Sequence, residues 1–364
     1  MKKTKKTVIW FLTVSLMILG AFSAFAEYNG PGTEKKFGPS TELINLVGPR
    51  EVKTGPGTGG ATGPVVRGVQ AESAGAGKTS GAGTVSDPRT NNADLSPELS
   101  GGSITFLKNK TTEQQQLAAV IRSSDGRVIV VDGGVDADAE HLYEVLKAAG
   151  GSVDAWLVTH PHGDHIGGLR AILRDHKDIA VKGIYGNFFE YEWYAAVDQA
   201  EAPALWVLNA ELLLLPKEKI HLDMKKNDAV SLSEKLSFRV LNNPKQSTGN
   251  HAVNSSGLMY DITVDGKHLV ILGDMGEQVG NEHYADGAIE NISCDWLQTA
   301  HHGQDGVGEV FYQMCHPKNI IWNTTEKIYL NKEHKYKTDM TKKWFSKMNI
   351  ENHYATIYDD VVIR

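Results

Sequence analysis

The segment Thr159–Gly168, with the sequence THPHGDHIGG, crowds together side chains that bind metals. Its three histidines and one aspartate fall within six positions, at His160, His162, Asp164 and His165. Burying such groups without partners costs several kcal/mol, so we expect a compensating charge beside them. Imidazole and carboxylate groups together suit Zn²⁺, and also Mn²⁺ or Fe²⁺. The segment therefore predicts a metal site.

Two later segments end apolar runs with groups of the same kind. Asp274 follows the run Leu269–Leu272, and His301 and His302 close the run Trp296–Ala300. The aspartate taken alone is typical of a cap or a turn. Adjacent side chains on a strand point in opposite directions, so we expect only one of the two histidines to be a ligand. In the order His-x-His-x-Asp-His, Gly-Asp, His-His-Gly, the three segments indicate one composite site.

The elements that must position these groups alternate between strands and helices. A strand over 154–159 leads directly into the histidine cluster, and a helix over 166–176 follows it. This order places the site on a loop at the carboxyl end of a strand, in an α/β unit. The other predicted elements are a helix over 139–150 and strands over 103–109, 117–123, 127–134, 181–186, 236–242, 257–274, 295–300 and 319–322.

These motifs resemble those of the metallo-β-lactamase superfamily. The sequence VVDGG, which contains Asp132, resembles its first motif, THPHGDHIGG its second, and ILGDMG its bridging-aspartate motif. AHHGQ and the segment Asn254–Leu258 are similar to motifs of the branch that includes the ComEC-type hydrolase domain of competence DNA-uptake proteins. The resemblance covers 103–364 and implies an α/β fold, an αββα sandwich that binds two metal ions at one edge.

The resemblance also implies a role for each residue. His160 and His162 would hold the first metal ion; Asp164, His165 and one of the terminal pair, with His301 favoured, would hold the second. Asp274 would bridge both ions, and Asp132 would orient a ligand imidazole. The ions, zinc first and manganese as the alternative, would share a bridging hydroxide. His302 would donate a proton to the leaving group or bind the developing anion, or else be structural.

Two departures from the family pattern affect these roles. Gln304 stands where the related branch has a serine, so a role for that hydroxyl is not carried over. A further histidine that many superfamily members place before Asp274 is not evident. His251 is near that point, and it is either a ligand or a surface histidine.

The amino-terminal part of the chain has a different composition. A basic head, an apolar run and Ala24-Phe25-Ala26 predict a signal peptide over 1–26, with cleavage after Ala26. Residues 27–102 hold 16 of the 37 glycines and 7 of the 12 prolines, which indicates a disordered linker. We therefore expect a secreted protein without stable membrane insertion, with one hydrolase domain over 103–364. Removing the four lysines of the signal takes the formal charge from −7 to −11, which argues against a general binder of polyanions.

The substrate is less constrained than the metal site. Phosphodiesters, DNA among them, suit a two-metal site, with lactones or other esters as the alternative. The lysine-rich segment 327–347 could follow a nucleic-acid backbone, or be a solvated basic face. The aromatic segment 187–215 could line a cleft, or be helical core.

Two other classes of function stay open: an iron-dependent oxidoreductase on the same scaffold, and a binding module without catalysis. The sequence does not predict an oligomeric state, and it leaves open whether Cys294 and Cys315 form a disulfide.

Overall fold

Strand β3 (Val128–Asp132) is buried on both of its faces. Val128 and Val130 pack in one apolar cluster with helices α3 (Ala139–Ala148) and α4 (Gly163–Asp175), whereas Ile129 and Val131 belong to a second cluster. Successive side chains of a strand point to opposite faces, so such a strand needs a packed layer on each side. The computed structural model describes Pro88 and residues 98–249, 251–290 and 292–364, all of which belong to one compact unit.

Two seven-stranded sheets form the centre of this described part. In order across the first sheet, its strands are β16 (Val361–Ile363), β1 (Ser103–Phe106), β2 (Ala118–Arg122), β3, β5 (Ala155–Leu157), β7 (Ile184–Tyr185) and β8 (Ile220–His221). The order across the second is β15 (Asn352–Ala355), β14 (Asn319–Trp322), β13 (Trp296–Gln298), β12 (Lys267–Ile271), β11 (Tyr260–Val264), β10 (Leu236–Val240) and β9 (Ala229–Ser231). Strands β4 (Ser152–Val153) and β6 (Ala180–Val181) pair separately.

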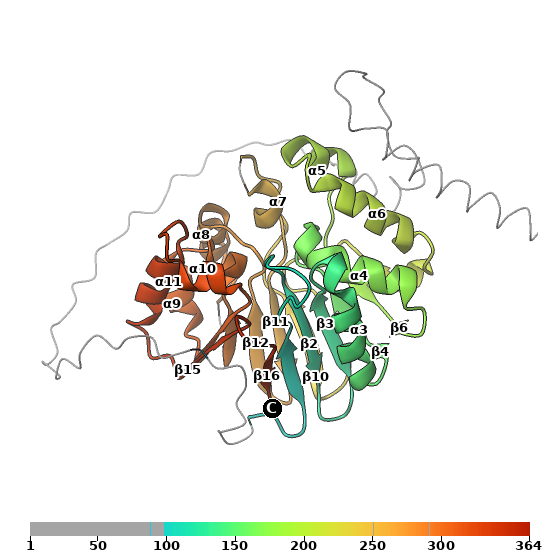
Figure 1. Ribbon diagram of the computed structural model, residues 1–364, viewed down its shortest axis with the longest axis horizontal. Coiled ribbons are helices and arrows are strands. Elements are labelled where there is room, and N and C mark those ends of the chain that lie inside the picture. Colours follow the sequence, from blue (N-terminus) through green and yellow to red (C-terminus); the bar gives the residue numbers. More distant parts are fainter. Residues whose placement is uncertain (1–87, 89–97, 250, 291) are drawn as a thin grey trace, which may run out of the picture. The chain divides into compact units, whose positions relative to one another are not determined.

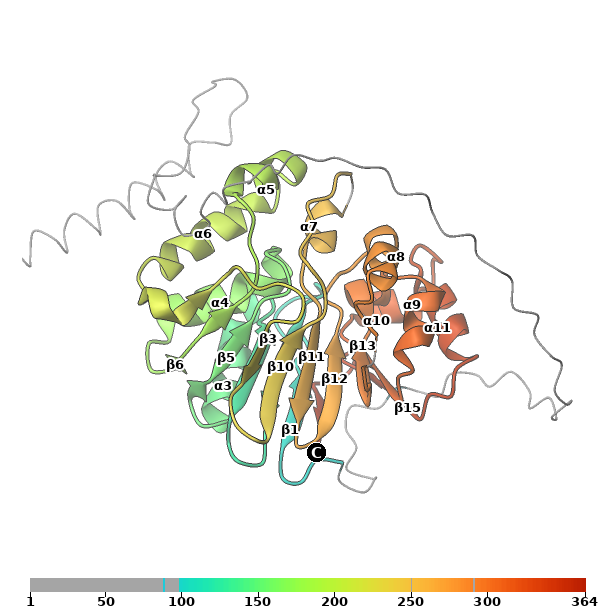
Figure 2. The same ribbon diagram turned by 180° about the vertical axis from the view of Figure 1, so that it is seen from behind.

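Helices cover the outer face of each sheet (Figures 1 and 2). Helices α3 and α4 pack on the first sheet. The second sheet is covered by α8 (Glu277–Ala285), α9 (Glu309–Cys315) and α11 (Thr338–Phe345), with which Val270 and Leu297 share a third apolar cluster. The predicted α/β fold, an αββα sandwich, is therefore confirmed. The remaining helices are α5 (Tyr191–Val197), α6 (Ala202–Leu212), α7 (Ala252–Ser255), α10 (Glu326–Leu330) and the 3₁₀ turns η1 (Asp136–Asp138), η2 (Lys217–Lys219) and η3 (Ala300–Gly303).

The parallel strands of both sheets end at one edge of the sandwich. In the first sheet β3, β5 and β7 run parallel, and in the second sheet β12, β13, β14 and β15 do. The connection from β1 to β2 reaches the same edge, because β2 pairs antiparallel with β3 and Ala118 lies opposite Asp132. The fold thus brings the ends of many strands together at one place.

Several sequence predictions are corrected by this structure. Helix α4 begins at Gly163, so Asp164 and His165 lie in its first turn and not on a loop. Strand β13 ends at Gln298, and His301 and His302 lie beyond it in the turn η3. The signal peptide expected over 1–26 lies outside the described residues, as does the linker expected over 27–102, except for Pro88 and 98–102.

Two other open points concern cysteines and membranes. Cys294 and Cys315 are both buried and carry free thiols. Every helix in the described part of the chain is too short or too polar to cross a lipid bilayer.

Candidate metal centre

The site begins where α4 packs closely against the loop after β3. A Cβ added to Gly168 would lie 2.0 Å from the carbonyl oxygen of Gly133, and one added to Gly167 would lie 2.3 Å from the nitrogen of Asp136. These two glycines therefore allow a helix–loop approach that larger residues would prevent. They hold the first turn of α4 beside the end of β3.

Asp132, at the end of β3, is fully buried and organises two of the histidines. Its carboxylate accepts hydrogen bonds from the backbone nitrogen of Thr159 at 2.7 Å, from the Thr159 hydroxyl at 2.8 Å and from His165 Nδ1 at 2.8 Å. The Thr159 hydroxyl lies 3.1 Å from Nδ1 of His160, which can donate to it. Both imidazoles are then held by Nδ1, so that Nε2 of each faces the other candidate ligands and can bind a metal.

His302 is held in the same manner from the second sheet. Its Nδ1 lies 2.9 Å from the carbonyl oxygen of Asn323, to which it donates, and its Nε2 lies 3.4 Å from Asp164 and 3.3 Å from Asp274. His301 and His302 both have left-handed backbone conformations, with φ of 49° and 54°. Since they lie in a turn, the expectation that neighbouring side chains point in opposite directions does not apply to them.

His301 has other partners. Its Nδ1 lies 3.1 Å from the carbonyl oxygen of Asp305, and its Nε2 lies 3.2 Å from the amide nitrogen of Asn254 and 3.7 Å from Asp274. A neutral His301 satisfies both ring nitrogens through Asp305 and Asn254. This geometry favours His302 over His301 as the residue facing the other candidate ligands, the reverse of the preference drawn from the sequence.

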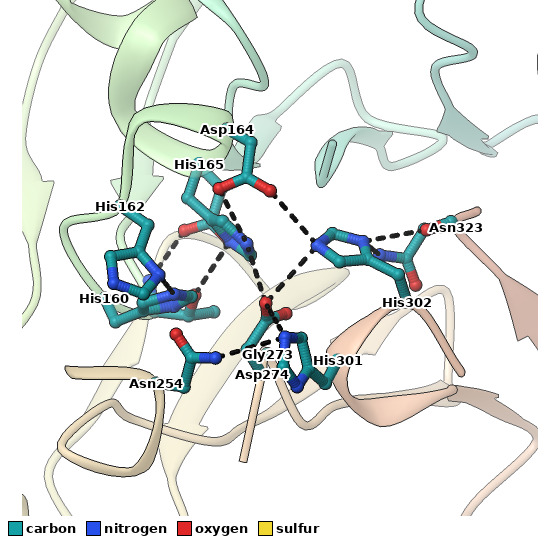
Figure 3. A network of polar contacts seen from close by, with 12 residues as sticks. His160, His162, Asp164, His165, Asn254, Gly273, Asp274, His301, His302 and Asn323 are labelled. Carbon is teal, nitrogen blue, oxygen red and sulfur yellow. Dashed lines mark hydrogen bonds and ion pairs between the residues drawn. The ribbon is translucent and has the colours of Figure 1, made fainter. Parts of the chain in front are cut away.

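Asp274 lies at the centre of the cluster (Figure 3). One of its oxygens is 3.3 Å from Nε2 of His165 and 3.3 Å from Nε2 of His302. Two groups of ligand atoms have all members within 4.8 Å of one another; the first is His160, His165 and Asp274, and the second is Asp164, His165 and His302. His162 adjoins the first group, with Nδ1 3.1 Å from Nε2 of His160. The described residues thus provide two adjoining places that could hold a metal ion.

The charges in the cluster compensate one another. Burial would raise the pKa of Asp274, but the imidazoles of His302, His165 and His301 outweigh it and hold that pKa well below its usual value. Burial disfavours the charged form of His302, yet Asp274 and Asp164 raise its pKa to about 9. Burial is likewise outweighed at His165, whose pKa is raised well above its usual value by Asp274 and two further carboxylates. Without metal, the protonated imidazoles of His165 and His302 therefore supply the positive charge that balances the carboxylates of the cluster.

The insert between β7 and β8 contributes two residues that the sequence did not single out. Asp198, which follows α5, lies 3.3 Å from Nε2 of His162. Glu201, which precedes α6, accepts a hydrogen bond of 3.0 Å from the backbone nitrogen of Gly163. Asp198 and Glu201 carry no motif, and only the packing of α5 and α6 above α4 brings them to the site (Figure 1).

The other residues noted in the sequence lie outside the two groups. His251 is about half exposed and lies 3.5 Å from Asp305. Gln304 follows η3, where its backbone nitrogen bonds to His301. In the basic segment, Tyr329, Trp344 and Phe345 are buried in the core, so they are not available to stack on bases. In the insert, Tyr194, Leu205 and other side chains are also core.

Comparison with known proteins identifies the pattern. A family model described as the metallo-beta-lactamase superfamily matches residues 111–306. Hydroxyacylglutathione hydrolase of Vibrio campbellii is 41% identical over 64 residues, which cover 18% of this chain and 24% of that protein. ComE operon protein 3 of Bacillus subtilis is 25% identical over 173 residues, which cover 46% of this chain and 20% of that protein. The chain thus spans a quarter or less of the length of these relatives.

Among solved structures, the metallo-beta-lactamase fold protein YhfI of Bacillus subtilis is similar, with a TM-score of 0.43 and 12% identity over 72% of this chain and 99% of that one.

Proposed function

The chain belongs to the metallo-beta-lactamase superfamily, and from this premise we propose that it is an exported metal-dependent hydrolase that uses two divalent ions to cleave phosphodiesters, with DNA as a candidate substrate. The observation that carries the proposal is the position of Asp274, which lies 3.3 Å from both His165 and His302 and so between the two groups of ligand atoms. A bridging carboxylate is what a two-metal site requires.

The residues present fit such a pair of ions. Among the described residues, three buried atoms of the cluster have no hydrogen-bond partner: Nε2 of His165 and of His302, which both lie near the Asp274 carboxylate, and Oδ1 of Asp274 itself. Buried polar atoms are normally paired, and each exception needs an explanation. Imidazole nitrogens and carboxylate oxygens, with their outer nitrogens held by Asp132 and Asn323, form a donor set suited to Zn²⁺ or Mn²⁺.

We assign the residues as follows. His160, His162 and Asp274 would hold one ion, and Asp164, His165 and His302 would hold the other, with Asp274 shared. Asp132 would fix the imidazoles of His160 and His165, directly or through Thr159, and Asp198 would orient His162. When bound, the two ions supply Lewis acidity and lower the pKa of a water molecule, so that a nucleophile exists near neutral pH.

His301 borders the metal centre as a neutral imidazole, since its Nδ1 donates to the carbonyl of Asp305 and its Nε2 accepts from Asn254. Its Nε2 lies 3.7 Å from Asp274 and is buried, so it borders the reacting space without being one of the two ligand groups. In this tautomer Nε2 carries no proton, so it would accept a proton or a hydrogen bond from the reacting groups and would not donate one. Asn254, which lies 3.2 Å from His301, would keep the ring in place.

The choice of phosphodiesters rests on the wider of the two similarities. The match to ComE operon protein 3 extends over 46% of the chain, whereas the match to hydroxyacylglutathione hydrolase extends over 18%. The latter similarity favours a second candidate, hydrolysis of an ester or thioester. Both candidates use the same ions and the same nucleophile, so the substrate itself has to distinguish them.

A single experiment tests the proposal. Purified protein is analysed for bound metal and assayed with bis-p-nitrophenyl phosphate, single- and double-stranded DNA, a lactone and a hydroxyacylglutathione thioester. We expect close to two zinc or manganese ions per chain and turnover of the phosphodiesters. Asp274→Asn should lose the activity. Asp295→Asn should keep it, because Asp295 precedes β13 and lies at the end of that strand away from the metal centre. Turnover of the thioester or lactone alone would support the second candidate, and bound iron with no hydrolysis would refute both.

A further inference from the structure

Asn254, in the short helix α7, lies inside the metal centre and so far has a role only toward His301. Its side chain is buried, with 3% of the residue exposed. Figure 3 shows the side chain beside the cluster, with the amide nitrogen toward His301 and the amide oxygen on the side of His160. The two ends of this amide group therefore have different surroundings, and each can have a function of its own.

The backbone holds Asn254 close to the first group of ligands. The backbone nitrogen of Leu258 donates a hydrogen bond of 2.9 Å to the carbonyl oxygen of Thr159. A Cβ added to Gly257 would lie 2.8 Å from that oxygen and 3.2 Å from Cβ of His160. The backbone nitrogen of Gly257 in turn bonds to the carbonyl oxygen of Asn254. This close packing fixes the end of α7 beside the segment that carries His160, without help from an ion.

The hydrogen bonds of His301 determine which end of the amide group faces the ring. The carbonyl oxygen of Asp305 can only accept, so Nδ1 of His301, which lies 3.1 Å from it, carries the proton of the neutral ring. Nε2 then has a lone pair and accepts from the amide nitrogen of Asn254 at 3.2 Å. The amide oxygen must therefore point away from His301.

This orientation leaves the amide oxygen of Asn254 without a partner. Among the described residues, no hydrogen-bond donor reaches this buried atom. A buried acceptor without a partner is costly and needs an explanation. The same condition holds for Nε2 of His165, Nε2 of His302 and Oδ1 of Asp274, which the proposed assignment makes metal ligands. An enclosed oxygen of this kind suits a small ion held between side chains better than a larger molecule from solvent.

The first ion can accept a further ligand. In the proposed assignment the second ion has four protein ligands, whereas the first has three: His160, His162 and Asp274. Catalytic ions commonly bind four to six ligands, water molecules among them. Carbonyl oxygens are among the ligands that suit Mn²⁺.

We propose that the amide oxygen of Asn254 is the fourth protein ligand of the first ion. The inference rests on the proposed two-metal function and adds one residue to its metal centre. Asn254 then has two contacts with separate tasks, because its oxygen binds the ion while its nitrogen donates to His301.

Two substitutions of Asn254 test this role by a metal titration. The purified protein is freed of metal and titrated with Mn²⁺, and the free ion is measured by electron paramagnetic resonance. Asn254→Leu removes the oxygen and should weaken the binding of one of the two ions by about tenfold or more, since losing even an outer partner of a ligand costs that much. Asn254→Asp keeps an oxygen and adds a negative charge, so it should bind that ion at least as tightly as the wild type.

The matched control is Asn209→Leu. Asn209 is also buried and also has an unpaired amide oxygen, but it lies in α6, outside the two groups of ligand atoms. This variant should bind both ions with wild-type affinity. A loss of Mn²⁺ affinity as large as in Asn254→Leu would refute the inference, because removing a buried amide would then be sufficient to weaken the site.

A role that acts only through His301 gives a different pattern. A carboxylate cannot donate to Nε2 of His301, so Asn254→Asp would then be as harmful as Asn254→Leu. The loss caused by Asn254→Leu would also disappear in a His301→Phe background, where no ring nitrogen needs a donor. We expect the tenfold loss to persist in that background. Equal losses in the two Asn254 variants, or no further loss in the double variant, would refute the metal ligand.

The titration also separates this inference from the proposed function, because it requires no substrate. If phosphodiesters are cleaved and Asn254→Leu binds both ions with wild-type affinity, the ligand is refuted while the function stands. If no phosphodiester is cleaved, but Asn254→Leu loses affinity for one ion and Asn254→Asp retains it, the function is refuted and the ligand stands.

Discussion

Asp132→Asn should weaken metal binding without unfolding the protein. The carboxylate accepts three hydrogen bonds of 2.7–2.8 Å, two from Thr159 and one from His165 Nδ1. An asparagine can keep its oxygen toward the backbone nitrogen of Thr159, but its amide group must then face His165. The imidazole responds by accepting at Nδ1 and carrying its proton on Nε2. That proton points at Asp274, 3.3 Å away, in the place that the metal needs.

The magnitude follows from the known effect of outer hydrogen bonds on metal ligands. Losing such a partner typically costs 10- to 100-fold in metal affinity, which corresponds to about 1.4–2.7 kcal/mol. The fold should suffer much less. Burial raises the pKa of Asp132 above its usual value despite the bonds from His165 and Thr159, so the protein interior already disfavours the charged form. A neutral isostere therefore relieves a buried charge while it removes a partner of protonated His165, and we expect the two effects on the stability of the metal-free protein to offset each other in large part.

The assay is a competitive zinc titration against a chromophoric chelator, combined with thermal unfolding of the metal-free proteins. Asp154→Asn is the matched control, because Asp154 is also buried near the same sheet but bonds to Val128, Arg127 and Lys182, away from the site. We expect weaker metal binding only in Asp132→Asn. Its metal-free form should unfold near the wild-type temperature, whereas Asp154→Asn should unfold at a lower one, because Lys182, Val128 and Arg127 outweigh burial and hold the pKa of Asp154 below its usual value. Wild-type metal affinity in Asp132→Asn would refute the argument that the imidazole tautomer is set by this carboxylate.

The other predictions concern pH, the insert and the close packing of α4. The pKa of His302 in the metal-free fold is about 9, above its unfolded value near 6.5. The stabilisation of the fold by protonated His302 is therefore fully present below about pH 6.5 and is lost as the pH rises to 9. Unfolding of the metal-free protein across this pH range measures that loss of stability. Because a metal must displace that proton and the one on His165, whose pKa is also raised, metal affinity should instead rise by about tenfold or more per pH unit below 9, and a flat profile in the same titration would contradict the assignment of His302. Asp198→Asn should lower metal affinity by about tenfold, measured by chelator competition, while Asp178→Asn on the exposed surface should not. Gly168→Ala should lower the free energy of unfolding by about 1–3 kcal/mol in urea denaturation, since the new methyl group meets the Gly133 carbonyl; an unchanged midpoint would show that the helix can move away.

The positions of the ligand segments could be predicted from the sequence because the strands before them are buried runs. Such runs, like the one before Asp274, are recognisable from their composition, and the carboxyl ends of parallel strands meet at one edge. The sequence also indicates the four layers of the αββα sandwich. A strand such as β3 has apolar residues on both faces, and it therefore needs a packed layer on each side.

The preference between His301 and His302 could not be predicted, because it depends on backbone conformation. Two successive left-handed residues turn both rings toward Asp274, and the partners that distinguish them, Asn254 and Asn323, come from distant segments. The same holds for Asp198, which reaches His162 only through the packing of the insert. Contacts of this kind arise from tertiary structure and leave no local pattern.

The ligands come from both sheets, and this divides the site between two halves of the chain. The first sheet and α4 supply His160, His162, Asp164 and His165, and the second sheet supplies Asp274 and His302. Neither half contains a complete set, so tight metal uptake requires that the halves have already docked. The time course of metal uptake during refolding would therefore show when the two sheets dock. A bound ion would oppose their separation during unfolding.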